Sequence, residues 1–216
     1  MSKIPNEVKL VRKDLSDWVW HFTRRKPKSN EPVELEALIE ILKTGFIKGG
    51  CDFECTETSV CLTDMPLLEA IRQSPKLKEA SYARFSDYGV GFNKKWLFGQ
   101  GGLPVIYHPR DRIDTDFSPP SDLRWRVVGI DLAKDKDYTW QREWRVKTAK
   151  LPVRQSEVLV VVRDHNEAME HLCSNHEIDF ERDEFYFDVD WSYVTQDSLV
   201  EASADGFDAF ITQRND

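Results

Sequence analysis

The chain has 216 residues, 40% of them hydrophobic, and no long Gly/Ser or Pro tract, which predicts one domain over 1–216 with a single core. Its N-terminus lacks the apolar centre of a signal peptide, and no stretch approaches the ~20 apolar residues that cross a bilayer. We therefore expect a soluble, cytoplasmic protein that does not bind membranes. Four cysteines are too few for a disulfide scaffold in a chain of this length.

The net charge of −8 is unevenly distributed. Residues 164–216 contain 15 Asp/Glu against two Lys/Arg, a net charge of −13, which leaves +5 for residues 1–163. The basic residues of the first three quarters could form a local footprint for nucleic acid. Ordinary solvated faces explain the same distribution equally well.

Residues 17–71 predict two strands and two helices. Residues 17–23 (DWVWHFT) alternate with a period of two and are rich in β-formers, which indicates a strand. Apolar residues recur at helical spacing over 33–45, where Gly45 supplies the stop. A short strand over 59–63 and a helix over 66–71 follow.

The rest of the chain is dominated by strands. The predicted elements are a helix over 167–173 and strands over 88–93, 104–108, 125–131, 143–148, 157–163 and 184–190. Strands outnumber helices and the helices lie early in the chain, so the pattern favours an α+β fold over strict βαβ alternation.

His21 and Glu143 are the first candidates for chemistry. An imidazole on a strand can hydrogen-bond a ligand hydroxyl, or it can be a core histidine bonded to a backbone carbonyl. In WQREWRV, alternation places Glu143 and Arg145 on one strand face and Arg142 and Trp144 on the other. The carboxylate can stabilise a developing cation, or it can form an ion pair with one of the two arginines.

Residues 88–110 combine five glycines with aromatic and basic side chains. The GQGG segment lacks the spacing of a P-loop or a dinucleotide fingerprint and indicates a turn before a ligand loop. Tyr88 and Phe92 could stack on a nicotinamide or a nucleobase, or fill the core.

The cysteines offer a weak metal pattern. Cys51, Cys55 and Cys61 are spaced more widely than the paired ligands of structural zinc sites, with Cys173 and His176 as remote candidates for a fourth ligand. We expect no metal. A metal-dependent nuclease is disfavoured because no compact group of carboxylates and lysines is present.

The order of several segments resembles a known family. HFT, an amphipathic helix ending in LKTGFI, VCLTDMPL, YGVGFNKKWLFGQGGLPVIY and a late QREWRV together resemble the AbiGi-type abortive-infection proteins. The same order is distantly similar to the DarT-like branch of ADP-ribosyltransferases. The resemblance covers about 17–163, and the acidic extension 164–216 lies outside it, where we expect it to pack on the core.

The resemblance implies a split, bent β-sheet with NAD as co-substrate in the cleft. It implies that Glu143 is catalytic and that His21 holds a ribose hydroxyl of NAD. It also implies that Gln141 contacts the acceptor and that Thr63 lies near the middle strand of the NAD site. We further expect NAD contacts at Phe22, Thr23, Tyr88 and Phe92, and acceptor contacts at Arg142 and Arg110.

Two functions from different classes remain open. The resemblance implies a NAD-dependent ADP-ribosyltransferase of a phage-defence or toxin–antitoxin system, which modifies nucleic acid or, less favoured, protein. Its acidic extension could bind an antitoxin or a chaperone. The alternative is a catalytically silent AbiGi-type antitoxin or binding module, because a fold can persist without its activity.

Overall fold

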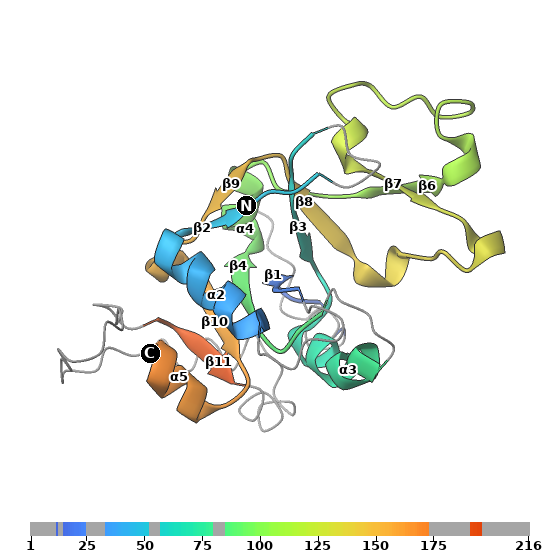
Figure 1. The fold of residues 1–216 in the computed structure, drawn as a ribbon. Coiled ribbons are helices and arrows are strands. Elements are labelled where there is room, and N and C mark those ends of the chain that lie inside the picture. The colour runs from blue at the N-terminus through green and yellow to red at the C-terminus, as the bar shows by residue number, and fades with distance from the viewer. Residues whose placement is uncertain are drawn as a thin grey trace.

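The computed structural model describes residues 12, 15–24, 33–51, 57–79, 85–172 and 191–195. This part of the chain has a mixed α+β fold built on a bent, mostly antiparallel sheet with the strand order β11-β10-β4-β1-β3-β8-β5 (Figure 1). Only β10 and β11 pair in parallel within this sheet. The α+β expectation is confirmed.

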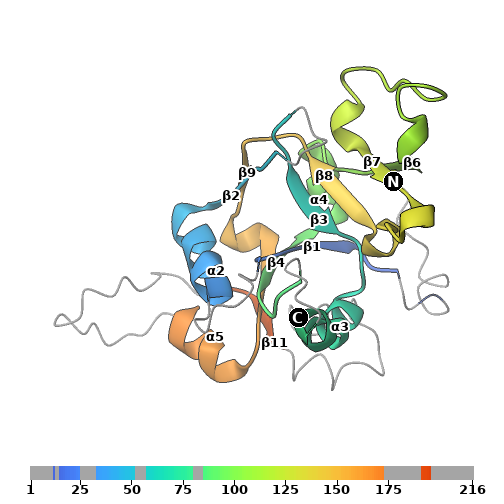
Figure 2. The same cartoon turned by 45° about the vertical axis from the view of Figure 1, so that its right-hand side comes forward.

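The strands of the main sheet are short, and most of them lie close to their predicted positions. They are β1 (Trp18–Phe22), β3 (Val60–Thr63), β4 (Gly89–Asn93), β5 (Leu103–Pro104), β8 (Glu143–Val146), β10 (Val158–Val162) and β11 (Tyr193–Thr195). Two further antiparallel strands, β2 (Phe46–Lys48) and β9 (Lys150–Pro152), form a separate ribbon. A parallel pair, β6 (Ile106–Pro109) and β7 (Val127–Ile130), forms a lobe that projects away from the helices (Figures 1 and 2).

The helices differ more from the predictions than the strands do. They are α2 (Val33–Thr44), α3 (Leu67–Glu79), α4 (Lys94–Gly99) and α5 (His165–His171), and short 3₁₀ turns include Arg110–Arg112, Arg124–Arg126, Leu132–Lys134, Thr139–Gln141 and Gln155–Glu157. The helix predicted over 66–71 continues to residue 79. The helix α4 was not predicted, because its six residues are too few to establish a period; Asn93 caps it by accepting a hydrogen bond from the Lys95 N–H.

Some predicted strands are divided, and some observed strands had no signal. The strand expected over 104–108 is split between β5 and β6, and 125–131 begins with a 3₁₀ turn before β7. The sequence did not predict β2, β9 or β11, each only three residues long. The strand expected over 184–190 lies outside the described residues.

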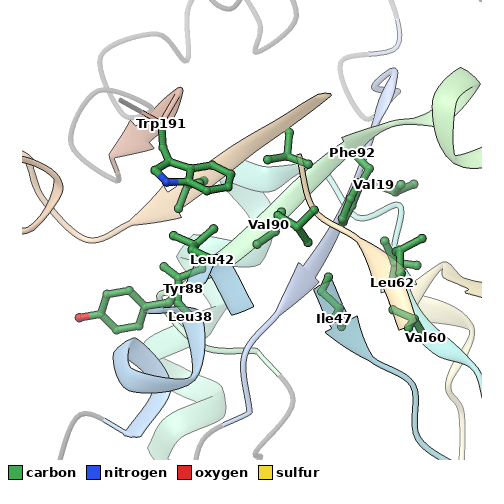
Figure 3. Packing of buried hydrophobic residues seen from close by; sticks show 14 of the residues in the cluster. Val19, Leu38, Leu42, Ile47, Val60, Leu62, Tyr88, Val90, Phe92 and Trp191 are labelled. Carbon is green, nitrogen blue, oxygen red and sulfur yellow. The ribbon is translucent and has the colours of Figure 1, made fainter. Parts of the chain in front are cut away.

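Two hydrophobic layers cover the two faces of the sheet. On one face Val19 of β1 and Phe92 of β4 pack with Leu38 and Leu42 of α2, and Figure 3 shows these side chains together with Trp191. On the other face the side chains from β1 and β10 pack against α3. The buried members of that second layer include Trp20, Phe22, Met65, Leu67, Ile71, Phe85 and Val161. The alternation predicted for β1 is thus confirmed.

The indole of Trp20 requires a glycine on the neighbouring strand. A Cβ atom at Gly91, which is paired with Trp20, would lie 2.2 Å from Cζ3 of that ring. The ring therefore lies flat over the β4 backbone, in the close approach that only glycine permits.

The junction between β1 and β3 is the weakest pairing in the middle of the sheet. These strands share one register pair, Trp20↔Thr63, whereas β1 and β4 share five and β3 and β8 share four. Beyond Trp20 the two strands are no longer paired, which opens the sheet beside His21.

Part of the acidic extension belongs to the sheet. The strand β11 pairs with β10. Ala168 of α5 and Leu172, the residue that follows α5, both belong to the core. No helix in the described part of the chain is long and apolar enough to cross a membrane.

Candidate functional site

A cavity of about 360 Å³ lies where β1 and β3 separate. Its walls come from the end of β1, from β3, from the start of β8 and from residues 48–51. His21 and Glu143, which are more than one hundred residues apart in the sequence, both line it. The junction that the sheet leaves unpaired is therefore also the place where the two leading candidates meet.

His21 bridges the separated strands. Its Nδ1 lies 2.9 Å from the backbone oxygen of Cys61, and because a carbonyl can only accept, Nδ1 carries the hydrogen. Burial lowers the pKa of His21, an effect that the bond to Cys61 partly opposes and the charge of Arg24 reinforces. The ring is therefore neutral at pH 7, and its Nε2 is left as a hydrogen-bond acceptor.

The carboxylate of Glu143 is paired with Arg145 and not with Arg142. Arg145 Nε donates to Glu143 Oε1 over 2.7 Å, and each side chain is only 7% exposed. Arg145 is fixed further by a 2.9 Å bond from Nη1 to the backbone oxygen of Trp125. Among the described residues, no donor contacts Glu143 Oε2. One oxygen is thus held and the other is left for a ligand.

Strand register explains why these groups lie close together. Trp20 is opposite Thr63, and Thr63 is opposite Glu143, so three adjacent strands align at this level of the sheet. Strands in a sheet lie about 4.8 Å apart, which puts the Cα atoms of Trp20 and Glu143 about 10 Å apart. His21 directly follows Trp20.

Three more predicted contacts lie at the cavity: Phe22, Thr63 and Gln141. The Thr63 hydroxyl donates to the backbone oxygen of Gln141 and accepts from the Met65 N–H over 3.0 Å. Both functions of the hydroxyl are therefore used within the protein. Thr63 positions the segment before Glu143 and has no donor left to offer a ligand.

Three predicted NAD contacts are core residues that do not line the cavity. The Thr23 hydroxyl bonds Ser86 Oγ at 2.8 Å, and the Tyr88 hydroxyl donates to Glu167 Oε1 at 2.8 Å. Phe92 is fully buried and stacks on Trp96 with ring centroids 5.3 Å apart. The core-filling alternative therefore describes Tyr88 and Phe92, because both belong to the hydrophobic layer under α2.

The two arginines predicted to contact the acceptor also lie outside the cavity wall. Arg142 directly precedes β8, and its Nη2 lies 3.7 Å from Asp64 Oδ2. Arg110 is exposed and belongs to the β6–β7 lobe, where its side chain lies over Gly129.

Sequence reasoning missed Lys48 and Phe85 at the cavity, and it counted Arg24 only among the basic residues of a possible nucleic-acid footprint. Lys48 and Arg24, both exposed, line the cavity and add positive charge, while the charge of Glu143 is balanced by Arg145. Phe85 adds an aromatic wall next to Phe22, with ring centroids 5.5 Å apart. Lys48 had no signal because its strand has only three residues.

The cysteine pattern is only partly described. Cys51 and Cys61 line the cavity, whereas Cys55, Cys173 and His176 lie outside the described residues. Within the described ranges, no group of three or more His, Cys, Asp or Glu could hold a metal ion.

The site thus offers a neutral imidazole acceptor, a half-engaged carboxylate, an aromatic wall and two cations. Such a set suits a ligand that has hydroxyl groups, a planar ring and a negative charge. Comparison with known proteins adds nothing to this description, since no family model, curated protein or solved structure matches the chain.

Proposed function

We propose that the protein is a NAD-dependent ADP-ribosyltransferase of a phage-defence or toxin–antitoxin system, with Glu143 catalytic and His21 binding NAD. The observation that carries the proposal is that His21 and Glu143 line one cavity. The single register pair between β1 and β3 supports an ADP-ribosyltransferase-like split sheet with the co-substrate in the split.

The cavity suits the nicotinamide and ribose of NAD. Its volume of about 360 Å³ is at the lower end of the ~300–1,000 Å³ typical of ligand pockets, so it holds part of a dinucleotide rather than all of it. Phe22 and Phe85 offer a surface for the planar nicotinamide. Arg24 and Lys48 supply charge for the pyrophosphate.

The transfer breaks one bond and forms one. The bond between C1′ of the ribose and the nicotinamide nitrogen breaks, and nicotinamide leaves with the electron pair. Glu143 Oε2 stabilises the cationic ribosyl centre, and the acceptor then attacks C1′ and loses its proton to Glu143 or to water. His21 Nε2 accepts a ribose hydroxyl hydrogen and so orients the reactive carbon.

Arg145 has a positioning role in this scheme. Its short bond to Oε1 and its bond to the Trp125 carbonyl fix the carboxylate before NAD binds. A group that is already oriented needs no rearrangement during the reaction.

A macromolecular acceptor would approach from the cavity mouth. Gln141, two residues before Glu143, lines the cavity and is placed to contact it. Arg24 at the mouth slightly favours nucleic acid over protein. A basic antitoxin or chaperone could bind the acidic extension.

One observation favours the catalytically silent module as the second candidate. The Glu143–Arg145 pair is buried and short, and an ion pair of this kind also serves a purely structural role. Activity of the purified protein separates the two functions.

The test uses labelled NAD with RNA, DNA and protein acceptors. We expect label on one acceptor, and we expect Glu143→Gln to lower the transfer rate by about 10²–10³-fold, the size seen when one electrostatic contact to a transition state is lost. Glutamine preserves an acceptor for Arg145, which makes it a better probe than alanine.

Glu167→Gln is the matched control, because Glu167 also pairs with an arginine but lies away from the cavity. It should label the acceptor as the wild type does. Absence of label on every acceptor, or equal labelling by wild type and Glu143→Gln, would overturn the proposal and favour the silent module. Cells should also tolerate expression of Glu143→Gln better than that of the wild type.

A further inference from the structure

Asp64 lies immediately after β3 and does not line the cavity. Its side chain is 15% exposed and contacts two cations. Lys94 Nζ is 2.7 Å from Oδ1, and Arg142 Nη2 is 3.7 Å from Oδ2. A carboxylate with two partly buried cationic partners joins the segments that carry them.

Lys94 connects Asp64 to the start of β1. It is the first residue after β4, and its backbone N–H donates to the Asp17 oxygen over 2.7 Å. Its Nζ also donates to the Ser16 oxygen. Because β1 lies between β4 and β3, the ion pair to Asp64 spans the beginning of β1 and joins the strands on either side.

Arg142 connects Asp64 to Glu143. Its backbone has φ 47° and ψ 50°, a left-handed conformation that is unfavourable for a side chain of this size. Two contacts from Asp64 stabilise that conformation. The Asp64 N–H donates to the Arg142 backbone oxygen over 3.0 Å, and the Asp64 carboxylate attracts the Arg142 guanidinium. The backbone of Arg142 determines where the next side chain, Glu143, points.

We propose that Asp64 is a positioning residue: by binding Lys94 and Arg142 it closes one end of the β1–β3 junction and directs the Glu143 carboxylate into the cavity. The bond from His21 to Cys61 spans the other, open end. The statement about Glu143 rests on the proposed transferase function, whereas the statement about the junction concerns the cavity alone.

The first test does not depend on activity. Both Cys51 and Cys61 line the cavity, but Cys51 is exposed and already accessible to reagent, whereas Cys61 is half-buried; alkylation of Cys61 relative to Cys51 therefore reports access to the inner wall of the cavity. The full-length chain is pulsed with iodoacetamide under native conditions, and the two sites are quantified by mass spectrometry. Asp64→Asn should increase the Cys61/Cys51 ratio several-fold, and Lys94→Met should do the same. An unchanged ratio in folded variants overturns the inference about the junction.

A matched substitution controls for loss of any Asp–Arg pair. Asp114 pairs with Arg124 through both carboxylate oxygens at 2.6 Å on the β6–β7 lobe, away from the cavity. Asp114→Asn should leave the Cys61/Cys51 ratio at the wild-type value. A rise equal to that of Asp64→Asn would show a general loosening and would also overturn the inference.

The second test measures NAD transfer. Asp64→Asn should lower kcat by about 10–100-fold, as expected for a catalytic group displaced by up to ~1 Å, with KM for NAD nearly unchanged. Asp64→Glu should restore part of kcat, a rescue that general destabilisation would not give. An active wild type with unchanged kcat in Asp64→Asn overturns the positioning of Glu143. An inactive wild type with a raised Cys61/Cys51 ratio instead overturns the transferase function and supports the role of Asp64 at the junction.

Discussion

Two glutamate–arginine pairs in this protein have nearly the same length and different surroundings. Glu143 and Arg145 are 2.7 Å apart on the cavity wall, and Glu167 and Arg163 are 2.8 Å apart between α5 and the end of β10. The first has a neutral imidazole near it, and the second holds the Tyr88 hydroxyl. An ion pair by itself therefore does not mark a functional site, and the cavity beside it does.

The exposure of the arginine separates the pairs further. The Arg145 side chain is 7% exposed, whereas that of Arg163 is 52% exposed. Water can therefore solvate Arg163, and if Arg163 is replaced by an apolar residue, water can reach its partner Glu167. For Glu143 the path for water is the cavity.

The largest expected effect is the loss of stability on removing the buried arginine. Arg145→Met leaves the Glu143 carboxylate without its partner and should lower the free energy of unfolding by about 3–5 kcal/mol. Arg163→Met should cost about 1 kcal/mol or less, because its pair is solvated. Urea denaturation of both variants measures the difference. Similar losses would mean that burial does not distinguish the two pairs.

The second prediction concerns Tyr88, whose hydroxyl bonds both members of the Glu167–Arg163 pair. Tyr88→Phe removes the bond to Glu167 and should lower the free energy of unfolding by about 1–2 kcal/mol at pH 8. Burial, more than the opposing bond from Arg163, raises the pKa of Tyr88 to about 12. The unfolded chain loses this proton near pH 10, so the stability that Tyr88 contributes is present below pH 10 and falls as the pH rises toward 12.

The difference between wild type and Tyr88→Phe should therefore shrink between pH 8 and pH 11. Subtracting the two urea denaturation curves at each pH cancels the other tyrosines and the lysines, which titrate in both proteins. A difference that stays constant over this range would contradict the burial of the Tyr88 hydroxyl in the folded state.

Alternation of residues predicted much of the site and little of the core around it. In β1 and β8 the period of two assigned the faces correctly, which placed Glu143 and Arg145 together. It could not show that these two side chains form an ion pair, because that depends on Trp125, a residue from a distant turn that fixes Arg145.

Residues outside the longer strands carried no such signal. Tyr88 immediately precedes β4, and its place in the core depends on α5, which supplies Glu167. The left-handed backbone of Arg142 is not readable from a sequence in which the residue is not glycine. Lys48 reaches the cavity because β2 pairs with β9, a contact between segments about one hundred residues apart.

The smallest expected effect is a pH dependence of the free energy of unfolding that comes from His21 on the cavity wall. Burial lowers the pKa of His21 in the folded protein, while the unfolded chain keeps the ordinary value of 6.5. Below pH 6.5 the unfolded chain binds this proton before the folded protein does, so stability falls as the pH is lowered and has no His21 contribution above that value. NAD affinity should fall in the same direction, because protonated Nε2 cannot accept a hydrogen bond.

His21→Asn isolates this contribution, since the asparagine amide can replace Nδ1 as the donor to Cys61 and does not titrate. Its free energy of unfolding should decline less steeply between pH 6.5 and pH 5 than that of the wild type. The region around Glu143 and Arg145 would then lose stability at acid pH through His21, and the region around Glu167 and Arg163 would lose stability at alkaline pH through Tyr88. Equal slopes for wild type and His21→Asn would mean that the imidazole is solvated and does not line a buried wall.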